Sequence, residues 1–186
     1  NKYYTEDGDL EREFILIKNY LLDNGFNFQI FSESEIEFLE NSITFTSFED
    51  WTCTDMYHKN NLSIFIANTT SKAINSKYHS RNENTNIVFW VKDFKFSGHY
   101  CFIKQPIIQN IVNVFIDENT EIIKGYKTEI IKKSAQEKVI KDYFKNLNSS
   151  FDLEIEVFNS NIIIRMMNVA SYENMIKLLN SLKNSD

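Results

Sequence analysis

The stretch IVFWVKDFKFSGHYCFIK, residues Ile87–Lys104, decides the fold that this sequence predicts. It opens with five successive apolar residues, and a short run rich in β-branched and aromatic side chains is typical of a strand covered on both faces. From Lys92 polar and apolar residues alternate, and Ser97-Gly98 carries a turn signal because glycine takes the positive φ of tight hairpins. The stretch therefore predicts a β-hairpin at the centre of a sheet.

The register of this hairpin sorts its side chains between two faces. With that turn, Phe96 opposes His99, and successive side chains alternate along each strand. One face then collects Trp90, Phe94, Phe96, His99, Cys101 and Ile103. We expect His99 and Cys101 to be packed core residues in this aromatic layer, and Asp93 and Lys95 to lie on the opposite face.

Helical spacing and strict alternation predict the elements that precede and follow this hairpin. Apolar residues recur at helical spacing in Asp9–Asn24 and after Ser171, which is a suitable cap for a last helix. Ser32–Asn41 fits either a short strand or one helical turn, and Glu49–Asn61 fits either a loop or an edge strand. Strands are expected over Phe26–Phe31, Ile43–Phe48 and Leu62–Asn68.

The remaining segments include a long polar stretch and a second hairpin. Thr69–Asn86 is the longest polar segment, and we expect it to be an excursion between two strands. Phe151–Phe158 and Asn161–Val169 alternate about Asn159-Ser160 and predict a hairpin that sets Glu154 opposite Arg165. A helix is expected over Pro106–Phe115, with a strand as the alternative because of its β-branched residues. Asp117–Thr120 is expected to be a turn, and a helix follows it through Leu147.

These elements predict an α+β fold with a mostly antiparallel sheet of about five to seven strands, on which about three or four helices pack. We expect residues 1–186 to form a single domain. The alternative division falls near Gln105 and separates a sheet-rich part, 1–104, from a helix–hairpin–helix part, 105–186. The single domain is favoured because the second part alone offers a thin core.

Composition excludes several classes of protein. The four glycines lie far apart, whereas phosphate-binding loops and nucleophile elbows need several glycines close together. Two cysteines do not make a disulfide framework, so we expect a reducing compartment and a cytoplasmic location. No run approaches the roughly 20 apolar residues of a membrane span, so we expect no membrane partner.

Charge is distributed unevenly along the chain. The net charge is −6, but residues 1–58 carry 13 acidic and 3 basic side chains, a net −10, whereas residues 59–186 carry 13 acidic and 17 basic, a net +4. Proteins that bind nucleic acid or anionic membranes are usually basic, so neither partner is expected here. The acidic first part is instead suited to a basic partner.

The cysteines and histidines make a weak case for a metal or a nucleophile. Cys53 with His58, and His99 with Cys101, would supply a Cys₂His₂ set that zinc accepts, but their spacings differ from those of common zinc motifs. No local signature of a catalytic thiol surrounds either cysteine. We therefore expect no metal and no cofactor.

The alternative enzymatic hypothesis is a Mg²⁺-dependent nuclease. Asp93-Phe94-Lys95 forms a D-x-K sequence at the end of a buried strand, where a carboxylate would hold Mg²⁺ and a lysine would polarise water. Asp55 or Glu13 would complete the site. The same residues are also typical of a solvated strand face, and the acidic chain would repel nucleic acid.

The leading hypothesis is a non-catalytic acidic module that binds a basic protein. Carboxylates and aromatic side chains are concentrated in one short span, where the acids would steer a basic partner and the aromatic residues would anchor it. The alternative is that these acids only form a solubilising face. Bacterial immunity proteins and antitoxins that neutralise a basic toxin work in this way, so that class is the expected function. The predicted binding residues are Glu33, Glu35, Glu37, Glu40, Glu49, Asp50, Trp51, Asp55 and Tyr57.

Overall fold

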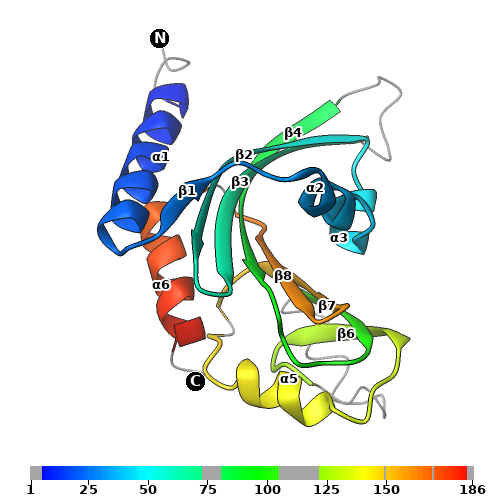
Figure 1. Ribbon diagram of the computed structural model, residues 1–186. Helices are drawn as coiled ribbons and strands as arrows, with labels where there is room; N and C mark the ends of the chain where they lie inside the picture. Colours follow the sequence, from blue (N-terminus) through cyan, green and yellow to red (C-terminus); the bar gives the residue numbers. More distant parts are fainter. Residues whose placement is uncertain (1–5, 73–80, 105–121, 149, 169, 184–186) are drawn as a thin grey trace.

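A single antiparallel sheet is the centre of the computed structural model, which describes residues 6–72, 81–104, 122–148, 150–168 and 170–183 (Figure 1). The strand order is β1-β2-β3-β4-β8-β7-β5-β6. The strands are β1 Asn27–Gln29, β2 Asp50–Lys59, β3 Leu62–Lys72, β4 Arg81–Val91, β5 His99–Lys104, β6 Tyr126–Lys132, β7 Leu153–Phe158 and β8 Asn161–Met166. The described helices are α1 Glu6–Asp23, α2 Glu33–Glu40, α3 Ile43–Thr46, α5 Glu137–Tyr143 and α6 Tyr172–Lys183. The α+β class and the antiparallel sheet are thus confirmed, and the described residues contain eight strands rather than about five to seven, and five helices rather than about three or four.

Helices cover both faces of the sheet. The helices α1 and α6 lie side by side on one face, and α2 and α3 lie on the other face (Figure 1). The ring centroids of Tyr20 in α1 and Tyr172 in α6 are 5.7 Å apart. The apolar run that opens the stretch Ile87–Lys104 lies in β4 and supplies both layers. Phe89 packs beneath α1 and α6, while Trp90 packs beneath α2 and α3. This run is therefore the doubly covered central strand that the sequence predicts.

Local signals correctly mark the end of α1 and the start of α6. The helix α1 ends in a Schellman motif, in which Phe26 N donates to Leu21 O at 2.9 Å and Gly25 N donates to Leu22 O at 3.0 Å. Gly25 has φ +79°, which a residue with a side chain adopts only at a cost. At the start of α6, the Ser171 hydroxyl accepts a hydrogen bond from Asn174 N at 3.4 Å.

The hairpin predicted over Ile87–Lys104 is wrong. The strand β4 ends at Val91 and pairs with β8, whereas β5 begins at His99 and pairs with β6 and β7. His99 consequently opposes Phe158 and Lys132 rather than Phe96. The β7–β8 hairpin, which is buried on both faces, lies between β4 and β5, and this long-range burial outweighs the local Ser97-Gly98 turn signal.

Three further expectations need correction. Ile43–Phe48 is not a strand, because its first residues form α3 behind the Ser42 cap. The polar excursion Thr69–Asn86 is shorter than predicted, because β3 continues to Lys72 and β4 begins at Arg81. The segment predicted as one helix through Leu147 instead forms the strand β6 followed by the shorter helix α5. The segments Pro106–Phe115 and Asp117–Thr120 lie outside the described residues.

The second hairpin is confirmed in its register. In the β7–β8 pair Glu154 opposes Arg165, as predicted, and Arg165 Nε donates to Glu154 Oε2 at 2.9 Å. Asn159 and Ser160 form the connection, both with positive φ. This hairpin is the part of the sheet where a local pattern and the tertiary structure agree.

Candidate functional site

A groove beside the sheet edge brings together much of the predicted acidic segment. It lies between the β1–α2 connection, the helices α2 and α3, and the strand β2, and its volume is about 770 Å³. We call it the acidic groove. Its lining consists of Phe28–Phe31, Ile36, Glu40, Phe45, Thr46, Phe48, Glu49 and Asp50–Asp55.

The acidic groove has an apolar floor and a charged rim. The rings of Phe45 and Trp51 pack together, with their centroids 4.7 Å apart, and form part of the floor. Ile30 leaves 79% of its surface exposed and Phe28 leaves 55%, and together with the exposed Ile36 they form a group of exposed apolar side chains along the groove. The rim carries the exposed carboxylates of Glu40, Glu49, Asp50 and Asp55. Exposed apolar surface ringed by one sign of charge is typical of an interaction site.

The structure divides the nine predicted binding residues into groups. Five of them line the acidic groove: Glu40, Glu49, Asp50, Trp51 and Asp55. Glu33 and Glu37 are exposed on α2 but do not line the groove. Glu35 and Tyr57 have structural contacts instead.

Glu35 stabilises the start of α2. Its carboxylate accepts from Ser32 N at 2.8 Å and the Ser32 hydroxyl accepts from Glu35 N at 3.3 Å, which together make a capping box. Lys92 Nζ also donates to Glu35 Oε1, at 2.5 Å. Burial raises the pKa of Glu35, but the hydrogen bonds from Lys92 and Ser32 outweigh burial and hold that pKa below its ordinary value. The Glu35 carboxylate therefore has a structural role, because its hydrogen bonds fix the start of α2.

Tyr57 is separated from the groove by a β-bulge. The pairing of β2 with β3 shifts between Thr54 and Tyr57, and Asp55 takes a φ of 51°. The extra residue turns Tyr57 to the face covered by α1, whereas Trp51 stays on the face covered by α3. Burial, and secondarily the Asp55 carboxylate, raise the pKa of the Tyr57 hydroxyl. Trp51 and Tyr57 therefore do not belong to one surface.

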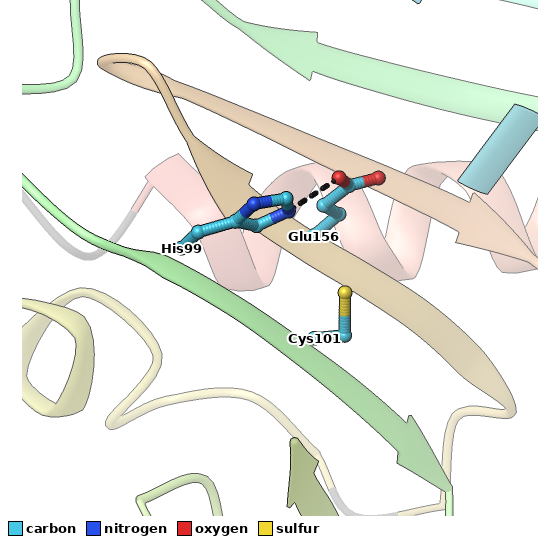
Figure 2. A group of neighbouring side chains, drawn as sticks. All are labelled: His99, Cys101 and Glu156. Atoms are coloured by element: carbon cyan, nitrogen blue, oxygen red, sulfur yellow. Dashed lines mark hydrogen bonds and ion pairs between the residues drawn. The ribbon is translucent and has the colours of Figure 1, made fainter. Parts of the chain in front are cut away.

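Sequence reasoning missed Glu156, whose carboxylate holds one wall of the groove. Figure 2 shows this buried side chain facing His99, whose Nε2 donates to Glu156 Oε1 at 2.8 Å. The same carboxylate accepts from Ile43 N at 3.0 Å and from Thr44 N and Thr44 Oγ1, both at 2.8 Å. It thereby satisfies the free N–H groups at the start of α3, while the Ser42 hydroxyl accepts from Phe45 N. The strand β7 has two glutamates, and in the predicted hairpin register Glu154 faces Arg165 whereas Glu156 faces the apolar Ile163, which was the available signal.

His99, Cys101 and Glu156 are also the one described group of three potential metal ligands, with donor atoms within 4.8 Å of one another. Structural zinc sites use four ligands, and a metal here would compete with α3 for the Glu156 carboxylate. We therefore interpret the cluster as structural, with the Glu156 carboxylate joining β5 to the start of α3. The four-residue set with Cys53 and His58 is excluded, because five interstrand steps of about 4.8 Å separate β2 from β5.

Neither cysteine is an activated nucleophile. Burial raises the pKa of the Cys53 thiol to about 12. Burial, together with the nearby carboxylates led by Glu156, raises the pKa of the Cys101 thiol to about 12 as well. Because the thiolate is the reactive form, both side chains are suited to packing rather than covalent chemistry.

The residues of the nuclease hypothesis are dispersed. Asp93 and Lys95 follow the end of β4, are exposed, and do not lie on a strand. Glu13, one of the acids proposed to complete that site, accepts from Tyr172 N at 2.5 Å and so supports the start of α6. Asp55 lies in the acidic groove. The described residues thus give this hypothesis no additional support.

Among the described helices, none has the length and apolar character needed to cross a membrane. No family model, no curated protein and no solved structure matches this chain.

Proposed function

We propose that this chain is a non-catalytic binding module that receives a basic protein in the acidic groove. The observation that carries the proposal is the exposed apolar surface of Phe28, Ile30 and Ile36 beside the rim carboxylates. Bacterial immunity proteins and antitoxins, which neutralise basic toxins, are the class of function that this chemistry suits best. The groove would bind its partner without altering it covalently.

Two physical effects support a basic partner at this place. The net charge of −10 over residues 1–58 attracts positive charge from a distance, which speeds association and disfavours acidic competitors. Once the partner arrives, the apolar side chains in the groove lose their contact with water, which supplies most of the affinity. Long-range steering and short-range burial therefore act at the same surface.

The proposal is tested by capture experiments with the full chain as bait in extracts of the cells that produce it. The paired change Glu40→Lys with Asp50→Lys reverses charge on the rim. The paired change Glu129→Lys with Asp142→Lys makes the same change in net charge at exposed positions on β6 and α5. The groove pair should abolish retention of a basic protein at low salt, while the control pair retains it.

Salt dependence gives a second measurement. Retention should weaken as salt is raised, because the Debye length falls from about 10 Å at 0.1 M to about 3 Å at 1 M. Equal loss of retention in the groove and control variants would show that net charge alone attracts the partner. Unchanged retention in the groove variant would contradict the proposal directly.

A further inference from the structure

The edge of β2 is only partly occupied in the sheet. The short strand β1 pairs with Met56–His58 and with no other part of β2. Asp50–Thr54 pairs with β3 on one side, and among the described residues no strand pairs with it on the other side. The bulge at Asp55 marks the point where the occupied and open parts of the edge meet. A run of five residues therefore presents an open strand edge.

This open edge lies along the acidic groove, whose lining includes the whole of Asp50–Asp55. In an antiparallel strand, every second residue directs its N–H and C=O groups away from the neighbour with which it pairs. An edge strand thus offers a row of hydrogen-bonding groups to an incoming extended chain. The apolar floor and the charged rim described above stand beside that row.

We propose that the basic partner enters the groove as an extended segment and adds to the sheet as a strand along Asp50–Thr54. The inference rests on the proposed function and specifies how the partner is recognised. Five residues of an added strand would span about 17 Å. Backbone hydrogen bonds to β2 would align the segment, and its side chains would decide which sequences bind.

The two faces of β2 specify the side chains of such a segment. Trp51 and Cys53 face the buried cluster that contains Phe45 and Phe65. Side chains of the added strand on that face would contact the apolar floor, and those on the other face would lie beside exposed Thr52. With carboxylates on the rim, the preferred segment alternates apolar residues with lysine or arginine.

Charge also argues against a second copy of this chain as the occupant. Two acidic rims brought together at this edge would repel each other, because like charges across an interface are unfavourable. Charged residues and bulges are, in addition, known devices that keep edge strands from aggregating. Protection against aggregation alone predicts no binding of a basic peptide, so an experiment distinguishes the two roles.

The test uses a synthetic peptide in which lysine alternates with valine, added to the full chain. Two analogues carry N-methyl groups, one on every valine and the other on every lysine, and therefore keep the charge and side chains. We expect the parent peptide to bind and to protect amides within Asp50–Thr54 from hydrogen exchange. One analogue should bind at least about tenfold more weakly, because its methyl groups replace donors to β2, and the other should bind nearly as well.

Each other outcome overturns strand addition. Equal affinity of both analogues, or binding without protection of Asp50–Thr54, would place the peptide in the groove without strand pairing. No binding of the parent peptide at millimolar concentration, or protection of these amides by dimerisation of the free chain, would also overturn it. The proposed function fails separately, when charge reversal at Glu40 and Asp50 leaves capture of the basic protein unchanged.

Discussion

At the scale of single residues, Glu156 shows how one buried carboxylate can position a binding surface. Its oxygens accept hydrogen bonds from His99 and from the first residues of α3. The helix α3 has only four residues and cannot be stable by itself, because a helix this short has little internal hydrogen bonding. Phe45, which lines the acidic groove, therefore depends on Glu156 for its position.

We predict that Glu156→Ala lowers the free energy of unfolding by about 3 kcal/mol, because it leaves the buried donors of Thr44 and the partly buried donors of Ile43 and His99 without their acceptor. Glu156→Gln should cost less, since one oxygen remains to accept hydrogen bonds. Urea unfolding measures both changes. The exposed Glu129→Gln serves as the control and should stay within about 0.5 kcal/mol of the unaltered chain. If Glu156→Ala lowered the free energy of unfolding by less than about 1 kcal/mol, the structural role of Glu156 at the start of α3 would be contradicted.

At the scale of elements, the β7–β8 hairpin decides the order of the strands. It lies between β4 and β5, so two strands that are close in sequence are not neighbours in the sheet. Its turn residues, Asn159 with φ 46° and Ser160 with φ 59°, have the two positive angles of a type I′ turn. Asparagine tolerates this conformation well, whereas serine pays a conformational cost in it.

We predict that Ser160→Gly raises the free energy of unfolding by about 0.5 to 1 kcal/mol, because glycine adopts positive φ without steric strain. The hydrogen bond from Phe94 N to Ser160 O uses the backbone and should survive the change. Asn159→Gly is the matched comparison and should gain less. The midpoint of urea unfolding checks both variants. A destabilised Ser160→Gly would show that the hydroxyl contributes more than the backbone strain costs.

At the scale of the whole molecule, the sheet interleaves the two parts of the chain. The strands β8 and β7 come from residues after Gln105, yet they separate β4 from β5, which both come before it. The buried cluster beneath α1 and α6 likewise draws side chains from both parts, among them Phe89 and Ile164. A cut near Gln105 would therefore break strand pairing on both sides of the β7–β8 hairpin.

We predict that residues 1–186 unfold in one cooperative transition, as interleaved strands share one sheet. Far-ultraviolet circular dichroism and tryptophan fluorescence should give coincident urea curves, and the amides of β4 and β8 should exchange together. The fragment 1–104 provides the control and should be unfolded, because β4 loses β8, one of its two partner strands, and β5 loses both of its partners. Two separate transitions, or a folded fragment, would contradict this prediction.

How much could be predicted depended on how local each signal is. The helices α1 and α6 and the β7–β8 hairpin were predictable, because apolar spacing, caps and turn residues act within a few positions. The bulge at Asp55 was not, and it moved Tyr57 away from the predicted site. Glu35 was assigned to binding although its capping partner, Ser32, is only three positions away, and its ion pair with Lys92, 57 positions away, could not be read from the sequence.

The sequence by itself determined the antiparallel α+β class, the doubly covered run that begins at Ile87, and the concentration of carboxylates before β3. Only the tertiary structure decided that β5 does not pair with β4, and that Glu156 accepts hydrogen bonds from the start of α3. It also decided that part of the acidic segment lines a groove beside an open strand edge. The reason is physical. Periodicity, helix caps and charge depend on residues that are close together in the sequence. Strand order and groove shape depend instead on which surfaces, far apart in the sequence, bury each other best.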